Sequence, residues 1–235
     1  MSYPLSDKAA VLARIREALR LPAHPPSHDN HAPATPPALP GKEEIGRWLP
    51  AVGAGYEEQV ALFARQAAAL KADFVRLPSL DAVPPRLAEL ARAEGWPADG
   101  IAAHPGEHSA ELVEKAGFRP FLAVPGYDRA KLEACAVSVT ACEALVAQTG
   151  SILVTARESG GRALTILPPH HIVVATAAQL VPDLPAAFAQ LRRTYGDTFP
   201  SLISFITGPS RTGDIERILV LGAHGPKKLT ILFVG

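Results

Sequence analysis

Hydrophobic and polar residues follow two different periods along residues 56–235. Apolar residues three or four positions apart are typical of amphipathic helices, and short continuous apolar runs are typical of buried strands. The pattern predicts helices over residues 56–72, 79–95 (after its prolines), 128–135, 140–148 and 184–196, with a short helical turn over 213–219. It predicts strands over residues 73–77, 100–104, 136–140, 151–156, 163–168, 171–177, 201–207 and 228–235.

The order of these elements predicts an α/β protein. Helices that connect apolar strands act as crossovers, and they cover both faces of a largely parallel sheet. The strands expected at 151–156 and 163–168 are joined by the short link RESGGR, which predicts a hairpin. The expected fold is therefore a mixed, mostly parallel sheet flanked by helices. In such sheets ligands bind beyond the carboxyl ends of the strands.

The beginning of the chain has a different pattern from the rest. Ser6 and Asp7 provide an N-cap for a short amphipathic helix within residues 1–21, whose apolar stripe is formed by Val11, Leu12, Ile15 and Leu19. Residues 22–41 are rich in proline, alanine and histidine, which is typical of a mobile linker. Biased composition explains its histidines, and metal binding is the alternative for His24, His28 and His31. Residues 42–235 are expected to form the folded domain.

Composition and charge exclude several classes of protein. The chain of 235 residues is 48% hydrophobic with 23 basic and 23 acidic side chains, which favours a sizeable core and argues against a nucleic-acid groove. Cys135 and Cys142 form no Cys-x-x-Cys motif, so an iron–sulfur cluster or zinc site held by this chain is not expected. No apolar run reaches the ~20 residues of a membrane span, and no signal peptide precedes the first helix. These features predict a soluble, cytoplasmic protein.

The segment GPSRTGD at residues 208–214 is the first candidate for chemistry. It lies between an expected strand and the expected helical turn, so its side chains would meet the free backbone amides of a helix N-terminus. Ser210, Arg211 and Thr212 would bind an anion there. Asp214 would cap the turn and orient Arg211, as a candidate catalytic residue. The alternative interpretation is a capped turn whose arginine lies on the surface.

A second segment, AHGPKK at residues 223–228, follows soon afterwards and can converge with the first. His224 is a candidate for proton transfer, and Lys227 adds positive charge for an anion. A turn with a structural histidine is the alternative. Thr149 and Ser151 flank a glycine that a left-handed helix cap would explain, and both hydroxyls are candidates for hydrogen bonds to the same ligand.

Other reactive side chains have both structural and chemical interpretations. His170 and His171 would point to opposite faces of a strand, so at most one of them can join a metal site, and no metal site is predicted. Cys142 beside Glu143 suggests a nucleophile, although small buried cysteines are commoner. Glu143 and Glu216 are equally explained as plain helix-face carboxylates. No nucleotide-binding glycine motif or nucleophile elbow is present.

Three longer motifs lie in the second half of the chain: QTGSILV, RALTILPPHHIVV and TGPSRTGDIERILVLGAHGPKKLTILFV. In wording, order and spacing they resemble the LUD domain of the LutC/YkgG-type lactate-utilisation proteins. The resemblance covers roughly residues 135–235, and the upstream elements fit it more loosely. One departure is Gln148, where the family commonly has a glutamate, and an amide at this position does not act as a base.

The resemblance implies a fold related to the NagB/RpiA/CoA-transferase group and to 5-formyltetrahydrofolate cyclo-ligase. It also implies participation in the oxidation of L-lactate to pyruvate beside iron–sulfur partner proteins. Those partners would carry the redox centres, so no cofactor is expected on this chain. The expected ligand is a small carboxylate or a phosphate-bearing molecule. Two alternatives remain: a freestanding enzyme or ligand-binding protein for a nucleotide, a folate or a CoA thioester, and a non-catalytic assembly subunit.

Overall fold

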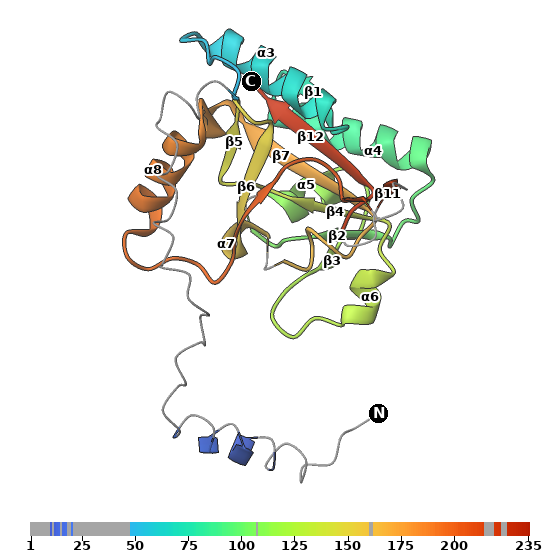
Figure 1. Cartoon of the computed structure of the whole chain (residues 1–235). Coiled ribbons are helices and arrows are strands. Elements are labelled where there is room, and N and C mark those ends of the chain that lie inside the picture. Colours follow the sequence, from blue (N-terminus) through green and yellow to red (C-terminus); the bar gives the residue numbers. More distant parts are fainter. Residues whose placement is uncertain are drawn as a thin grey trace, which may run out of the picture. The chain divides into compact units, whose positions relative to one another are not determined.

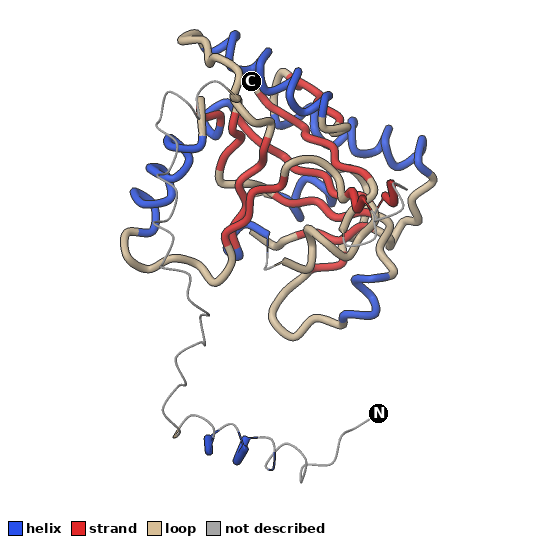
Figure 2. Tube along the Cα trace, in the orientation of Figure 1, coloured by secondary structure: helices blue, strands red, loops and turns tan. Residues whose placement is uncertain are grey.

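Figures 1 and 2 show the computed structural model of the chain, which describes residues 10, 12–14, 16–17, 20, 48–106, 108–159, 162–213, 219–221 and 225–235. The chain divides into two compact units, Met1–Lys42 and Glu43–Gly235. In the first unit, the described residues between 10 and 17 are helical and exposed. The predicted linker at 22–41 lies outside the described residues. The domain limits at residues 21 and 41 stay predictions.

A six-stranded sheet, in which every neighbouring pair is parallel, forms the centre of the second unit. Its order is β1 (Asp73–Leu77), β12 (Lys228–Val234), β7 (His170–Thr176), β4 (Val137–Thr140), β2 (Ile101–Ala103) and β3 (Phe121–Leu122). All residues of β7 except Thr176 are buried. Burial on both faces explains why this strand is a continuous apolar run rather than an alternating one.

Helices α4 (Val83–Glu94) and α5 (Ser109–Lys115) cover one face of this sheet. The predicted helix at 79–95 begins at its prolines instead of after them, because a proline suits the first turn, where its missing N–H has no partner to lose. A short 3-10 helix, η1 (Leu80–Ala82), precedes α4. The core on this face is formed mainly by Val83, Leu87, Leu112, Val113, Ile172 and Leu232.

A second sheet of four strands packs on the opposite face. Its order is β8 (Leu180–Val181), β5 (Ala144–Val146), β6 (Ser151–Thr155) and β9 (Ile203–Ile206), with β6 antiparallel to both of its neighbours and β8 parallel to β5. Helix α3 (Tyr56–Ala69) inserts Phe63 into the core between the sheets. Helix α8 (Leu184–Tyr195) covers the outer side of β5 and β6 (Figure 1).

The remaining elements are short. They are α6 (Arg129–Glu133), α7 (Ala156–Ser159), η2 (Ala177–Gln179) and the antiparallel pair β10 (Arg211–Gly213) and β11 (Leu219–Leu221). The predicted α/β class, with a mostly parallel sheet flanked by helices, is confirmed. Within the described part of the chain, no helix is long and apolar enough to cross a membrane.

Three local predictions are wrong. Residues 144–146, inside the helix predicted at 140–148, form β5 instead, because these three residues are apolar and completely buried, and complete burial removes the periodicity that separates helix from strand. Residues 163–168 form turns instead of a strand: Leu164 fills the core beside α6, and its carbonyl accepts a hydrogen bond from Ser138 Oγ over 2.6 Å. The predicted hairpin is therefore absent, and β6 pairs with β5 and β9.

The helical turn predicted at 213–219 is also wrong at both of its ends. Gly213 belongs to β10 and Leu219 to β11, and these strands pair with each other. Residues 214–218, between them, lie outside the described residues. The backbone amides of Thr212 and Gly213 are therefore not the start of a helix, so the anion site expected from a helix N-terminus has to rest on other groups.

Candidate functional site

The two candidate segments near the end of the chain lie side by side. The backbone N–H of Ser210 donates to the carbonyl oxygen of Pro226 over 2.9 Å. A Cβ added to Gly225 would lie 3.2 Å from the Cβ of Ser210, so a glycine suits this close approach. The backbone N–H of Lys227 donates to the carbonyl oxygen of Pro169 over 2.8 Å, just before β7 begins. The segments thus converge, as the sequence suggested.

The location of this convergence differs from the expected one. The first segment follows β9 and so begins at the carboxyl end of a strand, but that strand belongs to the second sheet. In the six-stranded sheet the segments lie at the amino ends of β7 and β12, because Lys227 is bonded to Pro169, directly before β7, and Ser210 is bonded to Pro226, two residues before β12. The carboxyl edge of the parallel sheet is a different part of the molecule.

A cavity of about 330 Å³ lies against both segments. Its polar lining residues are Arg162, Thr165, Ser204, Thr207 and Ser210, and the others are Ile166, Leu202, Ile206, Gly208, Gly225 and Pro226. Arg162 is the one charged residue in this described lining, which makes the cavity suitable for an anion. Sequence reasoning missed Arg162 because it lies in the segment taken for a hairpin link. A basic residue beside two glycines was the only signal for it.

A row of three hydroxyl groups runs from the β5–β6 turn to the edge of this cavity. Thr149 Oγ1 donates to Ser151 Oγ over 2.8 Å. Ser151 Oγ in turn lies 2.8 Å from Thr207 Oγ1. Thr149 and Ser151 were predicted as ligand contacts, but neither belongs to the cavity lining, and Thr207 connects them to it.

Arg211 is not among the residues that line the cavity. Its Nη2 donates to the carbonyl oxygen of Leu70, at the end of α3, over 2.8 Å. Gly208, with φ of 88°, allows this turn to approach α3, since an added Cβ would lie 2.8 Å from the same oxygen. An anion-binding role for Arg211 stays a prediction, as does one for Lys227, which is exposed.

Two other predicted residues are not placed by the structure. The candidate catalytic residues Asp214 and His224 lie outside the described residues, and Thr212 lies in β10. Their predicted roles stay predictions. The chemistry that can be derived from the described residues is therefore binding: a cation, several hydroxyl groups and an apolar wall around a small cavity.

The two adjacent histidines begin β7 and point to opposite faces of the sheet, as predicted. His170 Nε2 lies 2.9 Å from Thr230 Oγ1, and His171 Nε2 lies 2.8 Å from Thr140 Oγ1. Burial lowers the pKa of His170 to about 4 and the pKa of His171 to about 3. Their Nδ1 atoms are buried without a hydrogen-bond partner. In the described part of the chain, no three His, Cys, Asp or Glu side chains form a metal-binding group.

For three further residues from the sequence analysis, the structure shows packing or hydrogen-bond contacts within the fold. Cys142 is 1% exposed and belongs to the core between the sheets. Glu143 precedes β5 instead of lying on a helix face, and its carboxylate accepts hydrogen bonds from Tyr195 Oη and Thr155 Oγ1. Gln148 uses its side-chain amide to bond the carbonyl oxygen of Pro50 over 3.0 Å. Its role there is to connect chain segments, consistent with a position that does not act as a base.

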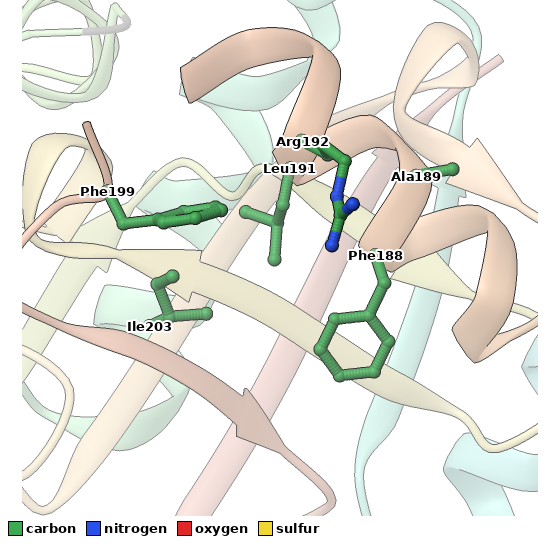
Figure 3. Close-up of a pocket in the computed structure, with 6 residues that line it drawn as sticks. All are labelled: Phe188, Ala189, Leu191, Arg192, Phe199 and Ile203. Carbon is green, nitrogen blue, oxygen red and sulfur yellow. The ribbon is translucent and has the colours of Figure 1, made fainter. Parts of the chain in front are cut away.

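Three other hollows in the described surface differ in chemistry. A groove of about 500 Å³ between α8 and β9 is mainly apolar, with Phe188, Leu191, Phe199 and Ile203 around the single cation Arg192 (Figure 3). A cavity of about 320 Å³ at the carboxyl ends of β4 and β7 is lined in part by His108, Thr176 and Gln179. A cleft of about 650 Å³ near the amino ends of β2 and β3 is lined in part by Asp99, Arg119 and Lys131.

Fold and site together define an α/β protein with a small cavity that is lined by β9 and by the two converging segments. Arg162 is the one charged residue among the described residues of this lining. The sequence matches the LUD domain family over residues 60–234. The chain therefore belongs to the LUD domain family, and the resemblance inferred from its motifs is confirmed.

Relatives of known name agree with this assignment. The chain is 32% identical over 145 residues to lactate utilization protein C of Bacillus velezensis, covering 60% of this chain and 54% of that protein. It is 35% identical over 106 residues to lactate utilization protein C of Bacillus subtilis, covering 44% of each. The matched part spans about half the length of these relatives. A DUF162 family protein from Deinococcus radiodurans has a similar fold, with a TM-score of 0.61 and 20% identity over 78% of this chain and 100% of that one.

Proposed function

We propose that this chain takes part in the cytoplasmic oxidation of L-lactate to pyruvate, as a subunit that binds the small carboxylate. Iron–sulfur partner proteins carry the redox centres in this proposal, and this chain holds no cofactor of its own. The names of its relatives support the link to lactate utilisation. The absence of any Cys-x-x-Cys motif in its sequence is compatible with that division of labour.

The observation that carries the proposal is the cavity between Arg162 and the Thr207–Ser210 turn. Arginine forms strong, charge-assisted hydrogen bonds with a carboxylate. Hydroxyl groups of Ser210 and Thr207 supply further polar groups in the same lining. A cavity of about 330 Å³ lies at the small end of the usual range for ligand pockets, which suits a three-carbon acid better than a folate or a CoA thioester.

Proton transfer would be the task of the two predicted catalytic residues. His224 precedes Gly225, and Asp214 follows Gly213, so each belongs to one of the segments that border the cavity. Oxidation of lactate to pyruvate releases two electrons and two protons, one from the hydroxyl group and one from Cα. In the proposal the redox centres of the partner proteins take up the electrons and the Cα proton passes to solvent, while a histidine is suited to accept the hydroxyl proton near neutral pH. In the proposal, His224 accepts this proton and Asp214 orients a neighbouring cation.

Thermal unfolding with added ligands tests the proposal. L-lactate or pyruvate at a hundred times its dissociation constant stabilises the folded state by about 2.7 kcal/mol. For a chain of this size the midpoint should rise by roughly 5–11 °C. The shift should be lost in Arg162→Ala and kept in Arg193→Ala, which removes a cation from α8 instead.

Other outcomes distinguish the alternatives. A shift with ATP, CoA or a reduced folate, and none with lactate or pyruvate, would favour a freestanding enzyme or binding protein. Co-purification with the iron–sulfur proteins without any ligand effect would favour an assembly subunit. Either result would refute a carboxylate-binding role for the cavity.

A further inference from the structure

In the Ser151–Thr207 pair the geometry allows either hydroxyl to donate, so the direction of the hydroxyl row beside the cavity follows from counting its protons. A hydroxyl group has one proton to donate and lone pairs with which to accept. Thr149 Oγ1 donates its proton to Ser151 Oγ. Ser151 is only 3% exposed, and the acceptor that the described residues offer for its own proton is Thr207 Oγ1, 2.8 Å away. The row therefore runs from Thr149 through Ser151 to Thr207.

Thr207 is left with a proton that no other residue of the row accepts. Its side chain is exposed, and it is the member of the row that lines the cavity. Successive hydrogen bonds polarise one another, so a hydroxyl that already accepts a bond becomes a better donor. The row thus presents one directed and strengthened donor to the cavity.

The backbone holds this row in place. Ile152 of β6 pairs with Ile206 of β9, so Ser151 and Thr207, the next residues outward, face each other across the antiparallel pair. Gly150 adopts φ of 67°, and an added Cβ would lie 2.9 Å from the backbone nitrogen of Ala67 in α3. The turn that carries the first two hydroxyls is therefore packed directly on a helix.

We propose that Thr207 donates a hydrogen bond to an anionic oxygen of the cavity's ligand, and that Ser151 and Thr149 are positioning residues for this donor. This inference rests on the proposed function for the place of the ligand, and it adds the chemical class of the ligand atom. That atom carries a lone pair that accepts the bond, which an ammonium group lacks. The Arg162 guanidinium in the same lining favours an acceptor with negative charge, from a carboxylate or a phosphate.

Binding measured by isothermal titration calorimetry on the full chain tests this inference. The probes are L-lactate, pyruvate and inorganic phosphate. Thr207→Val keeps the shape of the side chain and removes the donor, so the dissociation constant for the bound anion should rise roughly ten- to hundredfold. Thr207→Ser keeps the hydroxyl and should stay within about threefold of the wild type. Ser151→Ala should give an intermediate rise of about three- to tenfold, because it removes the polarising neighbour alone.

A matched control separates binding from folding. Thr230→Val removes a buried hydroxyl that bonds His170, so it should lower stability without changing the dissociation constant. Far-ultraviolet circular dichroism checks that each variant is folded. If Thr207→Val does not fold, Ser151→Ala decides the question by its effect on binding.

The outcomes separate this inference from the function on which it rests. Anion binding that is lost in Arg162→Ala but unchanged in Thr207→Val would overturn the role of the hydroxyl row alone. Binding of phosphate, but neither carboxylate, with a large effect of Thr207→Val would support the row and overturn the lactate proposal. Failure of the wild type to bind any of the three anions would overturn both.

Discussion

The two buried histidines should make the stability of this protein depend steeply on pH. An unfolded histidine has a pKa of about 6.5. Burial in the folded state lowers the pKa to about 4 for His170 and about 3 for His171. As the pH falls below 6.5, the unfolded chain takes up two protons that the folded chain does not. The histidines therefore cost no stability above pH 6.5, and stability is lost as the pH falls toward their folded pKa values.

The size of this effect follows from the same pKa values. At pH 5 each histidine favours unfolding by about 2 kcal/mol, so the pair removes about 4 kcal/mol from the free energy of unfolding. Below pH 6 the slope approaches about 2.7 kcal/mol per pH unit, from two protons at ~1.36 kcal/mol each. Glu57, Glu94 and Glu111 have pKa values lowered by hydrogen bonds from basic side chains, so their contribution is lost only below 4.5. The range from pH 7 to pH 5 isolates the histidines from these carboxylates.

Urea unfolding at half-unit steps between pH 7.5 and pH 5 measures the slope. His171→Gln retains a side-chain amide that can bond Thr140 but does not titrate, so the slope should fall by about half. The same holds for His170→Gln, and the double variant should lose most of the dependence. A slope that the double variant shares with the wild type would refute the assignment, because the protons would then be bound elsewhere.

Three further predictions concern stability and are checked by denaturant midpoints. Gly150→Ala should cost several kcal/mol more than Gly95→Ala: both glycines have φ of 67°, but an added Cβ at Gly150 would lie 2.9 Å from backbone nitrogen, whereas at Gly95 it meets nothing within 4 Å. Asp128→Ala should cost about 1 kcal/mol, because Asp128 accepts the N-terminal amides of α6. Phe63→Ala should cost about 3–5 kcal/mol, because this ring is 0% exposed between the sheets.

Part of the fold was accessible from the sequence because local pattern and tertiary environment agree there. Helices α3 and α8 alternate apolar and polar positions with helical period, and their apolar sides reach the cores. The strands β7 and β12 are apolar runs too short for buried helices and are bounded by proline or glycine. Each of these elements carries its own signal, so no knowledge of its neighbours was needed.

The errors lie where burial is complete or where pairing is decided at long range. Residues 144–146 are buried on every side, so their composition fits a helix as well as a strand, and only pairing with β6 selects the strand. The strand-like run at 163–168 does not pair with any described strand. Its Leu164 instead packs in the core cluster that includes Leu132 of α6. The local sequence of a segment does not specify which strand will pair with it.

At the candidate site, too, some features follow from the sequence and others only from the tertiary structure. The sequence by itself determined the family, the α/β class and the two segments whose glycines, hydroxyls and charges border the cavity, because these depend on residue type and order along the chain. Only the tertiary structure decided that Arg162 joins that cavity, that Arg211 turns instead to the carbonyl oxygen of Leu70, and that Thr207 completes the hydroxyl row. Those contacts join residues tens of positions apart, and they follow from how the two sheets pack, which no local pattern encodes.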